Sequence, residues 1–269
     1  MGNEKSGKTI AFHSYKGGTG KTTLITNVSA LYAQNGFNVG LIDFDLYAPS
    51  LASYFRKKPS LVLNDVLSGQ AAISDVVMDL GPELGLKGKF VVGFSSQRKD
   101  DIDEFELRCD TKWQLAAVKR FLQAKKELFE KFDLDFLFLD TSPGIRYWSV
   151  NSLAMANFLF LLFKDSDMDI EGTRKMMNEI YDAFLRVGSK YYLILNKVPG
   201  AVLDPNQTAP KQVWINELER VMGADVVGCV PCFCDVQFSR HEFLFSVNKS
   251  EHPFSISVRD LAAKIQSLT

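Results

Sequence analysis

The sequence predicts an α/β fold with a single doubly wound, mostly parallel sheet and helices on both faces. Two observations lead to this prediction. Short apolar runs of strand length recur along the chain, and segments with a helical spacing of apolar residues lie between them. Strands that alternate with helices favour right-handed crossovers, which place helices on both faces of a parallel sheet.

Seven apolar runs are the candidate strands. None of them alternates regularly between polar and apolar residues, so we expect both faces of the sheet to be covered. The runs are Thr9–His13, Asn38–Asp43, Lys89–Phe94, Asp135–Asp140, Phe158–Phe163, Tyr191–Asn196 and Asp225–Pro231.

Four segments between or after these runs have a helical spacing of apolar residues. Gly36 supplies a stop for the first of them. Because no linker, internal repeat or low-complexity tract interrupts the pattern, we expect one domain over residues 1–269. The helical segments are Lys21–Asn35, Thr111–Lys131, Glu171–Val187 and a last one that carries Val258, Leu261, Ile265 and Leu268.

Composition and charge exclude several classes of protein. Apolar residues make up 46% of the chain, which is enough for a large core, and a net charge of −1 gives no global attraction to nucleic acid or anionic lipid. Three of the four cysteines fall within six residues, unlike the framework of a small secreted domain. No apolar run has the roughly 18 residues that a membrane span needs, so we expect a cytoplasmic protein.

The stretch Ser14–Thr23, "SYKGGTGKTT", predicts a phosphate-binding loop between the first strand and the first helix. Glycines allow backbone N–H groups to turn toward phosphate oxygens, and the positive end of the helix adds to the attraction. Lys21 should reach the β- and γ-phosphates of a nucleotide, and the Thr22 hydroxyl should bind Mg²⁺. The candidate nucleotide-binding residues here are Gly17, Gly18, Thr19, Gly20, Lys21, Thr22 and Thr23.

Tyr15 stands where the usual phosphate loop has its first glycine, and the stretch "KGGTGKTT" resembles the deviant loop of the MinD/ParA family of ATPases. That resemblance implies the phosphate-loop NTPase fold, similar to the nitrogenase iron protein, and a homodimer in the ATP state. It also implies that Lys16 reaches across the dimer to the nucleotide held by the other subunit. A cation supplied by a partner would stabilise the charge of the phosphoryl-transfer transition state.

Carboxylates follow two of the candidate strands, at the sheet edge where doubly wound folds bind ligands. By the resemblance, Asp45 would orient or deprotonate the attacking water, and Asp43 would lie near the water shell of Mg²⁺. Asp140 ends an apolar strand and suits a second Mg²⁺ contact beside Thr22. The segment "DLYAPS" looks most like the Mrp branch of the family. An acidic strand-to-loop cap is the alternative for Asp43 and Asp45.

Recognition of the base is expected from residues after the last two strands. By the resemblance, Asn196 pairs its amide with adenine, Lys197 packs its stem on the base, and Pro231 belongs to a second lining segment. A turn residue is the alternative for Asn196. The expected ligands are therefore ATP or ADP with Mg²⁺.

Cys229, Cys232 and Cys234 form a C-x-x-C-x-C pattern, which raises a metal or iron–sulfur site. The Mrp branch carries clusters on a cysteine pair, but that pair lies after an earlier strand. We therefore expect buried thiols, with a redox role as one alternative and metal binding as another, which would need Cys109 or His241 as a fourth donor.

The resemblance also implies partners. A protein activator or cargo would bind the ATP-state dimer, with Tyr147 and Trp148 as candidates either for docking or for the core. Nonspecific DNA binding is possible, but Arg56–Lys58 and Lys119–Lys126 are more simply solvated faces. The closing "LAAKIQSLT" has one lysine and a modest apolar stripe, so we expect no autonomous membrane anchor.

The function expected from the sequence is that of a switch ATPase. It would bind Mg-ATP, form a nucleotide-sandwich homodimer, hydrolyse ATP slowly, and control the positioning or partitioning of a partner. The alternatives are an iron–sulfur cluster carrier of the Mrp kind and a phosphate-loop kinase or synthetase that acts on a small molecule.

Overall fold

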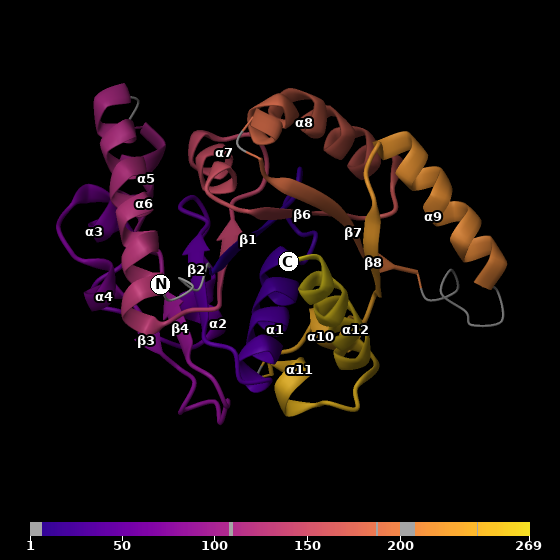
Figure 1. Cartoon of the computed structure of the whole chain (residues 1–269), viewed down its shortest axis with the longest axis horizontal. Helices are drawn as coiled ribbons and strands as arrows, with labels where there is room; N and C mark the ends of the chain where they lie inside the picture. The colour runs from indigo at the N-terminus through magenta and orange to yellow at the C-terminus, as the bar shows by residue number, and fades with distance from the viewer. Residues whose placement is uncertain (1–6, 108–109, 187, 200–207, 241) are drawn as a thin grey trace, which may run out of the picture.

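The computed structural model describes residues 7–107, 110–186, 188–199, 208–240 and 242–269. These residues form an eight-stranded sheet with the order β3-β4-β2-β5-β1-β6-β7-β8. Every neighbouring pair is parallel except β3 and β4. The expected mostly parallel, doubly wound sheet is confirmed (Figure 1). The strands are β1 (Lys8–His13), β2 (Val39–Phe44), β3 (Met78–Asp79), β4 (Phe90–Gly93), β5 (Phe136–Thr141), β6 (Phe158–Phe163), β7 (Lys190–Val198) and β8 (Val226–Pro231).

Helices cover both faces of this sheet (Figure 1). The longer ones are α1 (Lys21–Gln34), α5 (Lys99–Leu107), α6 (Thr111–Phe132), α7 (Tyr147–Ala154), α8 (Asp167–Arg186), α9 (Thr208–Met222) and α12 (Pro253–Leu268). The short ones are α2 (Leu51–Tyr54), α3 (Leu63–Ser68), α4 (Ile73–Val76), α10 (Cys234–Gln237) and α11 (Phe245–Asn248).

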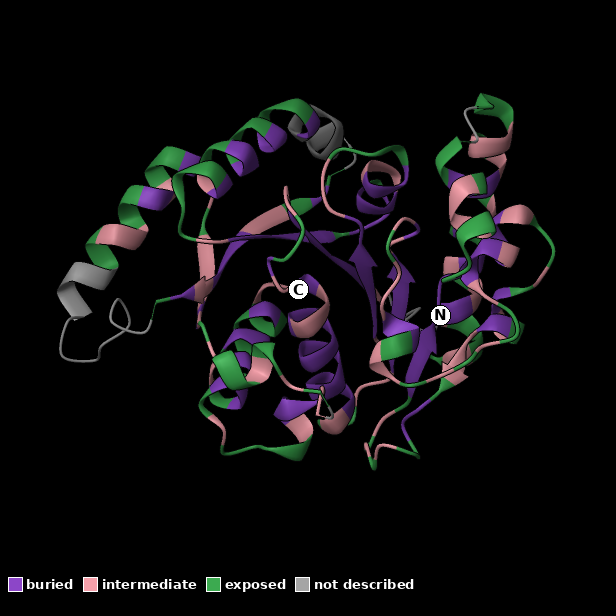
Figure 2. Cartoon of the chain, turned by 180° about the vertical axis from the view of Figure 1, so that it is seen from behind, coloured by how far each residue is buried: buried purple, intermediate pink, exposed green. Residues whose placement is uncertain are grey.

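Two apolar cores lie on the two faces of the sheet. Successive residues of a strand point to opposite faces, and in β5 the side chains of Phe136 and Phe138 enter one core while those of Leu137 and Leu139 enter the other. The first core is closed by α1, α11 and α12, and the second by α3, α4, α6, α7 and α8. The central strands are accordingly buried along their length, and α1 has no exposed residue, whereas outer helices such as α6 and α12 keep exposed faces (Figure 2).

The expected elements agree with the observed ones to within a few residues. The main differences are the helices α5, α7 and α9, which the sequence analysis did not single out. In addition, β3 has only two residues and pairs antiparallel with β4, and α8 begins at Asp167 rather than near Glu171. A two-residue strand has no periodicity to detect. Met176 and Met177 of α8 are buried in the core.

Candidate functional site

The phosphate loop connects β1 to α1 at the edge where the parallel strands end. Asp43 and Asp140 are direct neighbours across β2 and β5, and Phe12 of β1 pairs with Asp140 on its other side. The sheet order therefore brings together the two carboxylates, which lie far apart in the sequence, next to the strand that leads into the loop. This is the edge that the sequence predicts for the site.

The loop backbone leaves the start of α1 open to an anion. Gly20 caps α1 in the left-handed region with φ of 91°, and no side chain caps the first turn. Gly18 is also left-handed, with φ of 72°. The first N–H groups of a helix need an acceptor from outside, and at this helix the sequence provides no side chain for that purpose. A phosphate is a suitable acceptor at such a position.

Lys21 lies in the first turn of α1 and is only 7% exposed. Its ammonium donates a hydrogen bond of 3.1 Å to the Ser14 hydroxyl, which in turn donates one of 2.6 Å to the Lys16 carbonyl. Burial lowers the pKa of Lys21, while the charges of Asp140 and Asp45 act in the opposite direction. The ammonium is thus held at the base of the loop, between the carboxylates and the phosphate position.

Thr22 and Asp140 form the oxygen cluster that a magnesium ion would need. The Thr22 hydroxyl donates to Asp140 Oδ2 at 2.7 Å and accepts from the Ser50 hydroxyl at 3.5 Å. Asp140 Oδ1 is buried and has no partner among the described residues. Burial raises the pKa of Asp140 to about 6, against the opposing effects of Lys21 and Thr22. An unpartnered carboxylate oxygen beside a hydroxyl fits Mg²⁺, which prefers hard oxygen ligands and keeps several waters.

Asp43 acts as the acidic strand-to-loop cap that was the alternative for it in the sequence. Its carboxylate is fully buried and accepts hydrogen bonds from the N–H groups of Asp45, Ser50 and Leu51, at 3.1, 3.1 and 3.0 Å. Burial and the nearby Asp140 raise its pKa despite these donors. Asp43 therefore shapes the loop after β2 through backbone contacts; its expected place near the metal's water shell stays a prediction.

Asp45 reaches from this loop to the one after β5. Its Oδ1 accepts hydrogen bonds from the Ser142 hydroxyl at 2.6 Å and from the N–H groups of Tyr47 and Ala48 at 3.3 and 3.0 Å. Asp45 also lines the cavity that contains the phosphate loop. A carboxylate at this position can meet a water molecule beside the phosphates.

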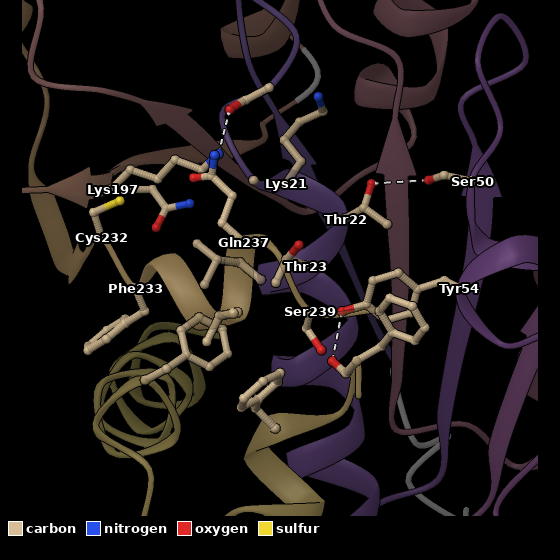
Figure 3. Close-up of a pocket in the computed structure, with 18 of the residues that line it drawn as sticks. Lys21, Thr22, Thr23, Ser50, Tyr54, Lys197, Cys232, Phe233, Gln237 and Ser239 are labelled. Carbon is tan, nitrogen blue, oxygen red and sulfur yellow. Dashed lines mark hydrogen bonds between the residues drawn. The ribbon is translucent and has the colours of Figure 1, made fainter. Parts of the chain in front are cut away.

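That cavity has a volume of about 480 Å³ and extends along α1 away from the loop. Lys21, Thr22 and Thr23 form its α1 wall, and Lys197 and Gln237 stand opposite (Figure 3). Gly17, Gly18, Gly20, Asn196 and Pro231 also line the cavity. Its outer part is aromatic and apolar, a feature the sequence analysis missed although the phenylalanines after β8 were a signal for it. The residues there are Tyr54, Phe233, Val236, Phe243, Phe245 and Phe254.

Asn196 and Lys197 support the phosphate loop from β7. Asn196 Nδ2 donates to the Thr19 carbonyl at 2.7 Å, and Lys197 Nζ donates to the Gly18 carbonyl at 3.0 Å. A Cβ on Gly20 would lie 2.5 Å from Asn196 Nδ2, so the loop needs glycine there for space as well as for its backbone angles. The expected contacts of Asn196 and Lys197 with a base stay predictions.

The expectation of buried thiols after β8 was wrong. Cys232 and Cys234 are exposed, Cys229 is half-buried, and Cys232 lines the nucleotide-sized cavity. Cys232 lies in the turn before the short helix α10, which begins at Cys234. Phe233 between them packs on Phe254 of α12, which leaves both thiols exposed. Within the described ranges no group of three His, Cys, Asp or Glu residues could hold a metal ion. The conjectural donors Cys109 and His241 lie outside the described residues.

Some of the residues considered for partner binding lie on the surface, and others lie in the core. Trp148 is buried, and Tyr147 beside it is exposed. Lys126 is exposed and pairs with Glu130 at 3.6 Å, as on an ordinary solvated face. Lys57, which pairs with Glu83, and Lys125, which donates to the Met155 carbonyl at 2.7 Å, are half-buried, so the expected solvated faces are only partly observed. None of the helices in the described part of the chain is long and apolar enough to cross a membrane.

A family model described as "AAA domain" (AAA_31) matches residues 7–190, more than half of the chain. The chromosome-partitioning ATPase Soj of Treponema pallidum is 28% identical over 175 residues, which make up 65% of this chain and 64% of Soj. The chain belongs to the MinD/ParA family of phosphate-loop ATPases. The deviant loop and the Asp-x-Asp segment that suggested this family are the ones that the fold brings together.

Two further MinD/ParA-related proteins extend the comparison. The septum site-determining protein MinD of Pyrococcus horikoshii, solved with Mg-ADP, superimposes with a TM-score of 0.73 at 18% identity, covering 97% of this chain and 96% of that one. The cytosolic Fe-S cluster assembly factor NUBP2 of Gallus gallus is 30% identical over 138 residues, 49% of this chain and 43% of NUBP2. MinD shares the fold with this chain, and NUBP2 is similar to about half of it.

Proposed function

We propose that this chain is an ATP-dependent dimerising switch. It binds Mg-ATP, pairs face to face with a second copy, hydrolyses the nucleotide slowly and thereby controls the position of a protein partner. The observation that carries this proposal is the oxygen cluster beneath the open start of α1. There the buried, unpartnered Asp140 Oδ1 lies beside Thr22, one residue after Lys21.

The residues would divide the work as follows. The N–H groups from Gly17 to Thr23 and the Lys21 ammonium bind the phosphates, and Thr22 and Asp140 hold Mg²⁺, which neutralises charge on the phosphate oxygens. Asp45 orients the attacking water and accepts its proton through the free part of its carboxylate. Asn196, Lys197 and Pro231 face the base, with Asn196 and Lys197 also supporting the loop.

Lys16 is the group that would make hydrolysis depend on dimerisation. It is half-buried at the mouth of the loop, and in the described part of the chain its ammonium forms no hydrogen bond or ion pair. A lysine directed to a nucleotide in the second copy would stabilise the transition state only when two copies meet. Turnover per chain should then rise with protein concentration.

Sizing of the Asp45→Ala protein with ATP and with ADP tests this function. Slow turnover should trap the ATP state as a dimer, while ADP should leave a monomer, and capture on the trapped dimer would then identify the activator or cargo. If the Asp45→Ala protein has the same mass with ATP as with ADP, the switch proposal fails.

The likeness to NUBP2 favours one second candidate, an iron–sulfur cluster carrier. The exposed Cys232 and Cys234 are the thiols that such a carrier could offer across two copies. Anaerobic purification decides this point: brown protein with stoichiometric iron, lost in a Cys232→Ser/Cys234→Ser variant, would support the carrier. Colourless and iron-free protein would exclude it.

A further inference from the structure

Tyr15, which replaces the first glycine of the usual phosphate loop, is packed against a glycine of another element. A Cβ placed on Gly172 of α8 would lie 2.2 Å from both Cδ1 and Cε1 of the Tyr15 ring. Gly172 has ordinary helical angles, so the close approach of the ring is what requires glycine there. A glycine inside a helix costs about 1 kcal/mol relative to alanine, and this one makes room for Tyr15.

The backbone beside Tyr15 is also held by the segment after β5. The Gly144 N–H donates to the Ser14 carbonyl at 2.9 Å, and a Cβ on Gly144 would lie 3.6 Å from the Tyr15 carbonyl oxygen. The first arm of the phosphate loop therefore lies between α8 and the segment after β5. Its position is set by two elements outside the loop.

This arm leads directly into Lys16. The Lys16 carbonyl is fixed by the Ser14 hydroxyl at 2.6 Å, and the same hydroxyl accepts from Lys21. Because the Lys16 ammonium has no partner of its own among the described residues, the backbone at Tyr15 and Lys16 determines the direction in which the side chain leaves the loop. Displacing the Tyr15 ring would therefore redirect Lys16, whereas the backbone of Lys21 is held in place by α1.

We propose that Tyr15 is a positioning residue whose ring, seated on Gly172, aims Lys16 at the nucleotide of the second copy. The inference rests on the proposed function, because it assumes that Lys16 acts across a dimer. It divides the loop into two parts: the arm Ser14–Lys16 serves the partner's nucleotide, and the turn Gly17–Thr23 serves the chain's own.

The test compares Gly172→Ala and Tyr15→Ala with two matched controls. Tyr15→Phe keeps the ring, and Glu171→Ala makes the neighbouring substitution on an exposed position of α8. For each variant we would measure the ADP dissociation constant, the ATP-induced dimer fraction and kcat at saturating ATP. A displacement of about an ångström at a reacting group costs on the order of 100-fold in rate.

We expect Gly172→Ala and Tyr15→Ala each to lower kcat at least 10-fold while ADP affinity stays within twofold. The double variant should be no slower than the slower single variant, since both act on the same contact. Tyr15→Phe and Glu171→Ala should keep kcat within twofold. Unchanged kcat in both test variants, or a loss of ADP affinity equal to the loss of kcat, would overturn the inference.

A Lys16→Ala variant separates this inference from the function on which it rests. If Lys16→Ala dimerises and turns over like the wild type, the role of Lys16 across the dimer is wrong. If Lys16→Ala is slow but Gly172→Ala and Tyr15→Ala are not, the proposed function stands and the positioning role of Tyr15 alone is wrong.

Discussion

Asp45 Oδ1 accepts a hydrogen bond of 2.6 Å from the Ser142 hydroxyl, and this contact joins the loop after β2 to the loop after β5. The two residues are 97 positions apart in the chain. Both loops border the cavity, because Asp45 and Pro143 line it. A change in either loop on nucleotide binding would therefore be transmitted to the other through the Asp45 carboxylate.

Replacing Ser142 with alanine should slow ATP hydrolysis without weakening the binding of ADP. A hydrogen bond to a charged group contributes about 1.5–3 kcal/mol, so loss of this one should lower kcat by about 10- to 150-fold as Asp45 loses its contact with the loop after β5. Steady-state ATPase rates and ADP calorimetry measure the two effects. Ser142→Ala/Asp45→Ala should be no slower than Asp45→Ala alone; an additive loss would show that Ser142 does not act through Asp45.

Replacing Asp140 with asparagine should remove the effect of Mg²⁺ on nucleotide binding. The substitution replaces the carboxylate, with its unpartnered Oδ1, by a neutral amide. Mg²⁺ should then strengthen ADP binding at least 10-fold less than in the wild type. The affinity for ADP without metal should be unchanged. Calorimetry with and without Mg²⁺ gives both values. Asp135→Asn, directly before β5, is the matched control. An undiminished Mg²⁺ effect in Asp140→Asn would argue against Asp140 as a magnesium ligand.

Replacing Asn196 with alanine should weaken the binding of inorganic triphosphate as well as that of ATP. Asn196 donates to the Thr19 carbonyl at 2.7 Å, so its loss should loosen the phosphate loop and reduce both affinities by similar factors, about 5- to 20-fold for one buried hydrogen bond. Competition binding with triphosphate distinguishes support of the loop from recognition of the base. If the variant binds ATP more weakly but triphosphate with unchanged affinity, Asn196 acts on the base alone.

Mg-ADP should protect Cys232 from alkylation and leave Cys234 reactive. Cys232 lines the cavity, whereas Cys234, two residues later, is exposed without lining it. N-ethylmaleimide should therefore label Cys232 at least fivefold more slowly in the presence of Mg-ADP, with less than a twofold change at Cys234. Peptide mass spectrometry reads both sites in one sample, and equal protection would contradict the placement of the nucleotide in this cavity.

The free energy of unfolding should decrease as the pH falls below 6.5, because of His13. Burial, assisted by the charge of Lys21, lowers the pKa of His13 from 6.5 to about 3. The unfolded chain therefore takes up a proton below pH 6.5 that the folded chain does not, so the stabilisation is present above pH 6.5 and is lost as the pH falls toward 3.

The effect of His13 can be isolated by His13→Asn, which retains a donor toward the Thr141 hydroxyl that His13 Nδ1 contacts at 2.7 Å. Between pH 7 and pH 5 the wild type should lose on the order of 2 kcal/mol more unfolding free energy than this variant. Urea unfolding at both pH values measures the difference. Equal losses in the two proteins would mean that His13 is protonated in the folded chain.

Much of the fold was predictable because local patterns dominate it. The seven apolar runs are strands of the observed sheet, and Lys21 begins α1 as the glycine-rich turn before it indicates. The loop motif and the carboxylates at strand ends likewise pointed to one edge of the sheet, because parallel strands bring their ends together. The thiols were misjudged because an apolar run such as the one ending at Pro231 does not show where the following turn leaves the core.

The sequence by itself determined the candidate residues for phosphate and magnesium binding, since glycines, Lys21, Thr22 and Asp140 are recognisable by type and spacing, and their roles stay predictions. Only the tertiary structure decided that Asp43 is used by three backbone N–H groups, that Asn196 supports Thr19, and that Tyr15 rests on Gly172. The physical reason is the range of the forces involved. Backbone preference and apolar periodicity act over a few residues, whereas these contacts join segments that meet only when the sheet order and the packing of α8 bring them within hydrogen-bonding or van der Waals distance.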